Sequence, residues 1–316
     1  MPKLITGGLG FIGTYLAKAL LKEGEEVILF DIVRTSPLVR DIQDKVRIVQ
    51  GDLASWAEVL EVVRRFKIDG IYHTGALLSA SAEDKPITAY HVNAGGTFNV
   101  LEAARHFDVE RVIFLSTIAT YGSGIPETVN EDTIQMPISM YGVTKVFCER
   151  LGEYYHRKFG IDFRGVRLPA VIGPGRGAGG ASAYSTLMIS EPALGRPYEI
   201  FVEEDVRMPL LYIHDAVDCL IRLYKADNAR LKRRMYCIAG FSPTAREIYE
   251  AVKRILPQAD LRFKPDPTMT EIVRSWPRFM DETRAREEWG WQTRYHLEES
   301  VQDFIRELKA HAEIYG

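Results

Sequence analysis

Tyr141 and Lys145 are the first residues whose types and spacing suggest chemistry. They are four residues apart in a stretch, residues 141–159, whose apolar side chains recur at helical spacing, so a phenol and an ammonium share one helix face. A free tyrosine, with a pKa of about 10, is a poor base at neutral pH, but a neighbouring lysine cation favours the phenolate. Tyr141 could therefore take a hydroxyl proton while hydride leaves the same carbon. Such pairs are also common on helix surfaces.

Two hydroxyls stand at the end of a predicted strand over residues 111–116. Ser116 and Thr117 could hold a substrate oxygen beside Tyr141, although strand-end hydroxyls also commonly cap the next turn. The predicted catalytic set is therefore Ser116, Thr117, Tyr141 and Lys145.

Gly7, Gly10 and Gly13 stand at three-residue spacing between a predicted strand over residues 3–6 and a predicted helix over residues 11–22. Glycine permits a tight turn, lets the backbone approach a pyrophosphate, and lets the helix sit close to the sheet. The helix start then offers free N–H groups and a positive dipole end to that anion. This pattern is typical of dinucleotide binding, but by itself it also fits an ordinary strand-to-helix turn.

Asp31 strengthens the dinucleotide prediction. It follows the predicted strand over residues 26–30, where a carboxylate can accept hydrogen bonds from the adenosine ribose. It would repel a 2′-phosphate, so NAD is expected rather than NADP, and Arg34 weakens this preference without reversing it. Asp52 and Leu53 are placed to flank the adenine, although an aspartate after a strand is as often a helix cap.

These residues need a scaffold, and the first half of the chain predicts one. Short β-branched runs alternate with amphipathic stretches, the rhythm of a parallel sheet wrapped by helices. The expected fold is α/β, a Rossmann-type doubly wound parallel sheet with a smaller C-terminal substrate lobe. The predicted strands cover residues 3–6, 26–30, 46–50, 70–74, 111–116 and 163–168, and the predicted helices cover residues 11–22, 56–66, 96–107 and 141–159.

A glycine-rich run over residues 173–180 marks the expected crossing into the second lobe. We expect residues 1–172 to form the NAD-binding domain, with residues 210–240 returning to it, and residues 173–316 mainly to bind substrate. A strand and helix over residues 210–225 and helices over residues 244–255 and 297–311 are predicted in this part.

Composition limits the possible partners. Forty basic and 43 acidic residues give a net charge of −3 and a pI near 6.2, with no run of one sign to hold nucleic acid. Three scattered cysteines suit neither a disulfide framework nor a metal knuckle, and no apolar stretch approaches the roughly 20 residues that span a bilayer. We expect a cytoplasmic protein without metal or membrane contact that acts on a small molecule.

Together these motifs resemble the extended short-chain dehydrogenases, the family of nucleotide-sugar epimerases and dehydratases. The likeness covers nearly the whole chain and includes the turn over residues 73–76 and Asn93. It implies bound NAD, with Lys145 holding the nicotinamide ribose and the backbone of residues 170–172 meeting the carboxamide. It also implies a homodimer built on the helices over residues 96–107 and 141–159. The implied cofactor-binding residues are Gly7, Gly10, Phe11, Ile12, Gly13, Asp31, Ile32, Asp52, Leu53, Thr74, Gly75, Ala76, Asn93, Tyr141, Lys145, Leu168, Ala170 and Val171.

Within that family the chain is most similar to the epimerase-type L-threonine dehydrogenases. The likeness lies in residues 73–80, 209–212, 275–277 and 281–291. One loop departs from it: those dehydrogenases carry Thr-Thr-Asp-Tyr where residues 181–184 read Ala-Ser-Ala-Tyr, so a carboxylate and two hydroxyls are reduced to one hydroxyl. The implied substrate-binding residues are Ser79, Thr117, Tyr141, Ser182, Tyr184 and Trp276.

Three functions fit these patterns. The first is an NAD-dependent dehydrogenase that oxidises a small polar alcohol, L-threonine or a related hydroxy acid. The second is a nucleotide-sugar 4-epimerase that keeps its NAD bound, although Ala170 stands where such enzymes usually carry asparagine. The third is a non-catalytic NAD-sensing regulator, which has no need of a tuned phenol.

Overall fold

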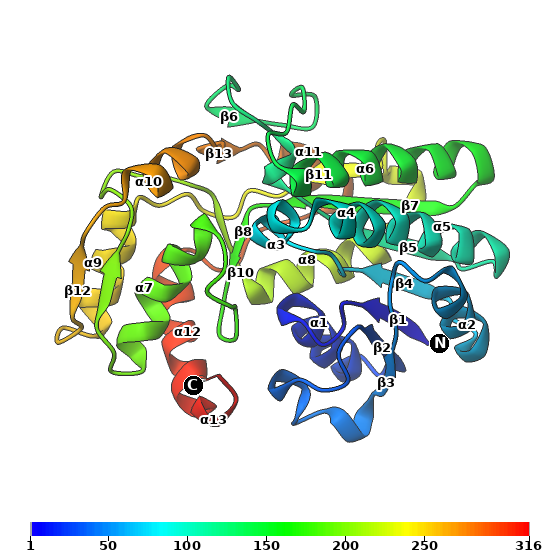
Figure 1. Ribbon diagram of the computed structural model, residues 1–316, viewed down its shortest axis with the longest axis horizontal. Coiled ribbons are helices and arrows are strands. Elements are labelled where there is room, and N and C mark those ends of the chain that lie inside the picture. Colours follow the sequence, from blue (N-terminus) through cyan, green and yellow to red (C-terminus); the bar gives the residue numbers. More distant parts are fainter. Residues whose placement is uncertain (1, 316) are drawn as a thin grey trace.

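The computed structural model describes residues 2–315 and has a seven-stranded, all-parallel sheet at its centre (Figure 1). The strand order, with β1 between β4 and β2, is that of a doubly wound fold, which confirms the predicted α/β class. In order across the sheet the strands are β11 (Met235–Cys237), β7 (Asp162–Leu168), β5 (Arg111–Thr117), β4 (Gly70–His73), β1 (Lys3–Thr6), β2 (Val27–Asp31) and β3 (Arg47–Gln50).

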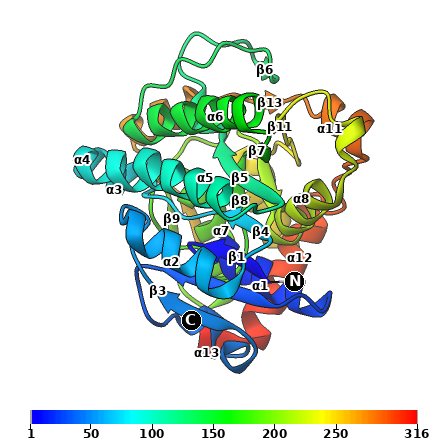
Figure 2. The ribbon, with the colours of Figure 1, turned by 90° about the vertical axis from the view of Figure 1, so that its right-hand side faces the viewer.

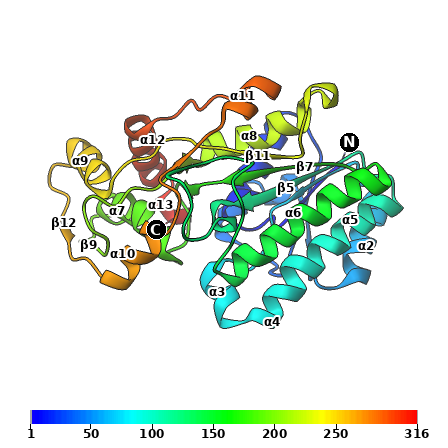
Figure 3. The same cartoon turned by 90° about the horizontal axis from the view of Figure 1, so that it is seen from above.

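Helices cover both faces of this sheet, because successive strand residues point to opposite sides. On β1, Leu4 belongs to the core under one helical layer and Ile5 to the core under the other. Figure 3 shows α2, α5 and α6 along one side of the sheet and α8 on the other. The layers consist of α2 (Trp56–Phe66), α5 (Gly96–His106) and α6 (Met140–Phe159) on one face and of α1 (Phe11–Lys22) and α8 (Ile213–Lys225) on the other.

The long helix α6 has clear signals at both ends. The Ser139 side chain accepts a hydrogen bond from the backbone N–H of Gly142 at 3.1 Å, and Gly160 closes the helix in the left-handed region, with φ 76°. Tyr141 therefore lies in the first turn and Lys145 in the second.

A second lobe lies beside the sheet and contains mainly helices (Figure 1). Buried apolar residues of α7, α9 and α12 pack against one another, and a short parallel pair, β9 and β12, borders them. Its elements are α7 (Tyr184–Ala193), β9 (Tyr198–Ile200), α9 (Ala245–Ile255), β12 (Leu261–Phe263), α10 (Pro267–Arg274), α12 (Leu297–Ala310) and α13 (Ala312–Tyr315).

Short elements connect the larger ones, and Figure 2 shows α3 and α4 projecting beyond α5. One of them, Tyr90–Gly95 (η3), is a π-helical turn that leads directly into α5. The others are α3 (Ser79–Asp84), α4 (Pro86–Ala89), α11 (Thr283–Trp289), the pairs β6 (Thr128–Val129) with β13 (Phe279–Met280) and β8 (Ala170–Ile172) with β10 (Leu210–Tyr212), and the 3-10 turns η1 (Pro37–Val39), η2 (Gln43–Lys45), η4 (Ile118–Thr120), η5 (Ala181–Ala183) and η6 (Asn228–Arg230).

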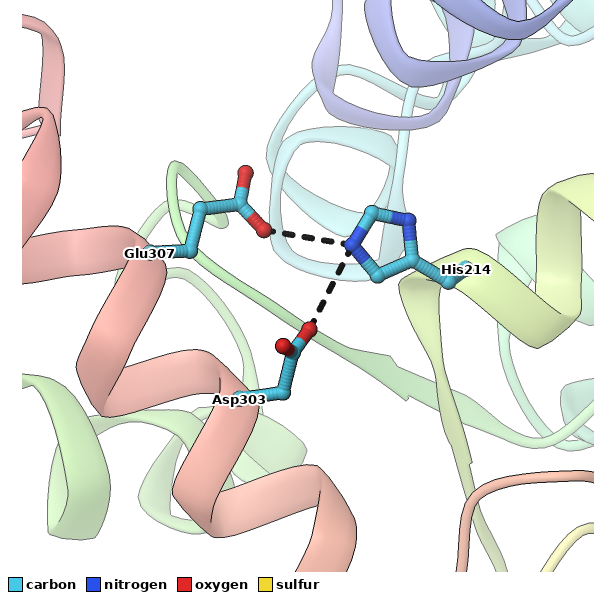
Figure 4. A group of neighbouring side chains, drawn as sticks. All are labelled: His214, Asp303 and Glu307. Carbon is cyan, nitrogen blue, oxygen red and sulfur yellow. Dashed lines mark hydrogen bonds and ion pairs between the residues drawn. The ribbon is translucent and has the colours of Figure 1, made fainter.

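A polar cluster fastens the second lobe to the first. His214, at the start of α8, lies between two carboxylates of α12, with its Nε2 atom 3.5 Å from Asp303 and 3.2 Å from Glu307 (Figure 4). Tyr15 of α1 and Tyr315 of α13 both donate hydrogen bonds to Glu307. Within residues 2–315, no helix combines the length and apolar character needed to cross a membrane.

Candidate active site

Tyr141, Lys145 and Thr117 meet where the carboxyl end of β5 faces the first turns of α6. The Thr117 side chain shares a hydrogen bond with the Tyr141 hydroxyl. The Nζ atom of Lys145 lies 5.7 Å from the centroid of the Tyr141 ring and donates a hydrogen bond to the backbone oxygen of Leu115 at 2.7 Å. The structure thus brings together a phenol, a cation and a hydroxyl, as the sequence indicated.

Burial shapes the electrostatics of this group. Lys145 is 3% exposed, and within residues 2–315 no carboxylate lies within 4.0 Å of its Nζ atom. Burial lowers the pKa of Lys145 to about 8. Burial raises the pKa of the half-buried Tyr141, and the hydrogen bond with Thr117 opposes that rise. A buried cation next to a phenol favours the phenolate, so the arrangement suits proton removal from an alcohol.

Ser116 bonds elsewhere on α6, because successive strand residues face opposite sides. Its expected contact with the substrate oxygen stays a prediction. The Ser116 hydroxyl donates to the carboxylate of Glu149, which is fully buried on α6. Glu149 also pairs with Arg167 of β7 at 2.8 Å and accepts from Gln135 at 3.0 Å.

The glycine turn between β1 and α1 leaves no room for side chains. Gly7 has a φ of 65°, and a Cβ atom there would meet the Cα atom of Gly75 at 2.6 Å. A Cβ atom on Gly13 would meet the carbonyl oxygen of Gly7 at 2.3 Å, whereas one on Gly10 would stay 3.2 Å from it. This close approach keeps the N-terminus of α1 next to the ends of β1 and β4.

Asp31 ends β2 beside that turn. One of its carboxylate oxygens accepts the backbone N–H of Leu9 at 3.0 Å, and the other accepts that of Val33 at 3.3 Å. The neighbouring Ile32 is exposed, and Arg34 donates to Gln50. Each carboxylate oxygen has a further lone pair for a ribose hydroxyl.

Asn93 belongs to the frame of the site. Its carboxamide accepts the backbone N–H of Leu77 at 2.8 Å and donates to the Leu77 oxygen at 3.0 Å and to the Thr144 hydroxyl at 3.1 Å. Both of its amide protons are therefore donated within the chain, and its expected contact with the cofactor stays a prediction. Asn93 lies in the π-helical turn and ties the loop before Ser79 to α6.

The other expected cofactor residues line the carboxyl edge of the sheet or pack beneath it. The Thr74 hydroxyl donates to the backbone oxygen of Thr6 at 2.7 Å, and Leu53 packs under Gly75. The Asp52 side chain accepts the N–H of Ala54 at 2.9 Å in the turn before α2, whose N-cap is Ser55. The remaining members are half-buried or buried: Phe11, Ile12, Ala76, Leu168, Ala170 and Val171.

The expected substrate residues fall into two groups. Ser79, at the start of α3, and Ser182, in η5, are half-buried, and Trp276 lines a cavity of about 370 Å³ between the loop after η4 and the end of α10. Tyr184 is fully buried against Phe201 in the second lobe, and its expected contact with substrate stays a prediction. The cavity is bounded by Ser123, Gly124, Ile125, Pro126, Glu127, Arg274, Ser275, Trp276 and Arg278.

Sequence reasoning missed two buried polar features near the site. His73 links the Thr6 hydroxyl at 2.7 Å to the Thr97 hydroxyl at 3.0 Å, and burial lowers the pKa of His73 to about 3, so the ring stays neutral. The position of Glu149 on the face of Tyr141 and Lys145 was detectable, since it follows Lys145 by one helical turn, whereas its pairing with Arg167 of β7 is a tertiary contact.

Within residues 2–315, one group of side chains has the types and spacing that could ligate a metal ion: His214, Asp303 and Glu307 (Figure 4). Both of its carboxylates already accept hydrogen bonds from tyrosine hydroxyls, Asp303 from Tyr212 and Glu307 from Tyr15. The group therefore forms part of the polar cluster that joins the lobes.

Comparisons with known proteins match this geometry. A sequence model of the NAD dependent epimerase/dehydratase family matches residues 3–239. An uncharacterised epimerase/dehydratase from Staphylococcus aureus strain MRSA252 is 35% identical over 301 residues, which cover 93% of this chain and 92% of the relative. The holo form of a GalE-like L-threonine dehydrogenase from Cupriavidus necator has a TM-score of 0.92 and 33% identity, over 98% of this chain and 100% of that one. For the L-threonine dehydrogenase from Clostridium difficile the TM-score is 0.92 and the identity 32%, over 100% and 99%.

Proposed function

Since this chain belongs to the NAD-dependent epimerase/dehydratase family and is an NAD-dependent enzyme, we propose that it is a dehydrogenase of a small polar alcohol. The proposed substrate class is L-threonine or a related hydroxy acid. The similarity to L-threonine dehydrogenases over nearly the full length supports this choice over the other members of the family.

The residues around the glycine turn fit NAD. The crowded turn at Gly7 and Gly13 keeps side chains away from the N-terminus of α1, where a pyrophosphate would sit, and Asp31 presents carboxylate oxygens for the adenosine ribose. Lys145, with no carboxylate of residues 2–315 within 4.0 Å of its Nζ atom, is available to a nicotinamide ribose. When bound, NAD accepts the hydride that the alcohol carbon gives up.

The chain's own groups handle the proton. Tyr141 takes the hydroxyl proton at its phenolic oxygen as the carbon–oxygen bond becomes a carbonyl. The Thr117 hydroxyl, already bonded to Tyr141, orients the substrate oxygen. Lys145 stabilises the phenolate from one helical turn away, and its bond to the Leu115 oxygen holds it there.

The observation that carries this proposal is the buried Lys145 cation beside Tyr141, with no carboxylate of residues 2–315 within 4.0 Å of its Nζ atom. Replacing Tyr141 with phenylalanine should lower kcat by about 10²–10⁴-fold while NAD affinity stays near that of wild type, because only the proton-transfer group is lost. Tyr249→Phe, on α9 of the second lobe, is the control. The assay is NADH absorbance with a panel of amino-acid and hydroxy-acid alcohols, with NAD binding measured by calorimetry.

Two outcomes would contradict the proposal. A Tyr141→Phe enzyme with more than a small fraction of the wild-type rate would remove Tyr141 from catalysis. Conversion of a UDP-sugar without net NADH would instead identify a nucleotide-sugar 4-epimerase.

We also propose that two copies pair through α5 and α6, which lie side by side on the outer face of the sheet (Figure 3). Large apolar side chains are exposed on this surface, including Phe98 at 46%, Phe147 at 48% and Tyr154 at 46%. Sedimentation should show a dimer that Phe147→Glu converts to monomer, and Ile134→Glu, in an exposed loop, should leave it intact. A monomeric wild type would refute the pairing.

A further inference from the structure

Arg176 stands alone in charge within the segment that enters the second lobe. It lies in the glycine-rich loop between β8 and η5 and is the sole charged residue from Leu168 to Ser190. That segment therefore offers a cation, and it offers no carboxylate for a substrate ammonium group.

The guanidinium of Arg176 is held by neutral oxygens. It donates to the Ser182 hydroxyl at 2.7 Å, to the Ser182 backbone oxygen at 3.3 Å and to the Thr186 hydroxyl at 3.1 Å. Thr186 is 2% exposed, so the floor of this arrangement is buried. Within residues 2–315 no carboxylate lies within 4.0 Å of Arg176.

A carboxylate partner is the usual neighbour of a buried guanidinium, and Arg176 lacks one among residues 2–315. Burial lowers the pKa of Arg176 to about 10, and no acidic neighbour offsets it. The two fully buried arginines of β7 show the ordinary solution, since Arg164 pairs with Asp162 and Arg167 with Glu149. A cation taken partly out of water without a counter-charge gains most from an anionic ligand.

The loop lies where such a ligand would reach the proposed catalytic group. Gly173 packs against Phe11 at the start of α1, and η5 packs against α10, the helix that leads to Trp276. Just before the loop, Leu168 pairs in register with Thr117. β8, from which the loop departs, lies where the two lobes meet (Figure 1). The cation is thus at the carboxyl edge of the sheet, where ligands of this fold bind.

We propose that Arg176, with the hydroxyls of Ser182 and Thr186, binds a carboxylate or phosphate of the substrate. Each hydroxyl oxygen accepts from the guanidinium, so its own proton remains free to donate to the same anion. The inference rests on the proposed dehydrogenase function and narrows its substrate to hydroxy compounds that carry an anionic group. The amino group of threonine has no counter-charge in this segment.

The test measures binding to the NAD-saturated enzyme at constant ionic strength, with 3-hydroxybutyrate and its neutral amide as matched probes. Wild type should bind the carboxylate about ten- to a hundredfold more tightly than the amide, the effect of hydrogen bonds to a charged group. Arg176→Gln should remove this preference, and Arg176→Lys should retain part of it, because a point charge replaces a two-pronged donor. Arg196→Gln, at an exposed arginine beyond α7, is the control and should change nothing.

Several results would overturn the proposal. They are equal affinity of wild type for the two probes, binding of neither probe, and a carboxylate preference that survives in Arg176→Gln. A loss of NAD affinity in Arg176→Gln with the preference intact would also do so, because it would assign the cation to the cofactor diphosphate. Preference that depends on Arg176 in a protein that oxidises no alcohol would sustain the anion site and refute the dehydrogenase function.

Discussion

Replacing Glu149 with alanine should strongly destabilise the protein, because it would leave the buried guanidinium of Arg167 without its carboxylate partner. Glu149 is fully buried and accepts from Arg167 at 2.8 and 3.1 Å, and also from Ser116 and Gln135. Without it, the Arg167 side chain, 2% exposed, keeps only the hydroxyl of Tyr121 and a backbone oxygen as acceptors. Removing one partner of a buried ion pair typically costs about 3–5 kcal/mol.

That cost converts into a measurable melting temperature. At about 2.1 cal/mol/K per residue, unfolding 316 residues has an entropy of about 0.7 kcal/mol/K, so Tm should fall by about 5–8 °C. Scanning calorimetry would measure it, with Glu153→Ala, a half-exposed residue of the same helix, as the control. The double variant Glu149→Leu with Arg167→Met should recover most of the loss, because no charge is left unpaired. A single variant within about 1 °C of wild type, or additive losses in the double variant, would refute the reasoning.

Three further predictions concern the glycine turn, Lys145 and the polar cluster that joins the lobes. Gly13→Ala should abolish measurable NAD binding, because the new Cβ atom would lie 2.3 Å from the Gly7 carbonyl oxygen. Gly10→Ala, whose Cβ atom would lie 3.2 Å from the same oxygen, should weaken NAD binding only modestly. Similar NAD affinities of the two variants in calorimetry would contradict this. Lys145→Met should be at least as stable as wild type at pH 7 without cofactor, because burial lowers the pKa of Lys145 to about 8. The stability difference between the two proteins should shrink between pH 8 and about 10.5, where the unfolded lysine loses its proton. A difference in thermal unfolding that widens as the pH rises would contradict this. Glu307→Ala should lower the free energy of unfolding by about 1–3 kcal/mol at pH 7, because the Glu307 carboxylate accepts hydrogen bonds from two tyrosine hydroxyls. The pKa of Glu307 is lowered despite the opposing effect of burial, so this loss of stability, measured by urea unfolding, should become smaller below about pH 4.5. A loss that grows in acid would contradict this.

Long periodic elements were predictable, while short ones depended on their partners. The helices α1 and α2 have the predicted bounds, because a sustained apolar face marks both and the Ser55 side chain caps the start of α2. β11 spans three residues, Met235–Cys237, and no pattern within it indicates a strand. Its conformation comes from pairing with the edge of β7, a contact that the local sequence does not encode.

The site shows the same division between local and tertiary information. Four-residue spacing was enough to place Tyr141 and Lys145 on one face of α6. The direction of Ser116 depends on which helix covers that face of the sheet, and the burial of Tyr184 depends on how the second lobe packs. That no carboxylate of residues 2–315 lies near Arg176 can be recognised only from the three-dimensional structure, which gives the position of each acidic side chain.

The late position of β11 in the chain has a consequence during synthesis. β7 ends at Leu168, but the strand that covers its outer edge begins at Met235, after all of α7 and α8 have been made. At roughly 5–20 residues per second, the ribosome leaves that edge without its partner for roughly 3–13 s. An open edge of this kind presents unpaired N–H and C=O groups to other chains. The nascent protein therefore passes through a stage in which it can pair with a neighbour, and chains released before Met235 would remain in it.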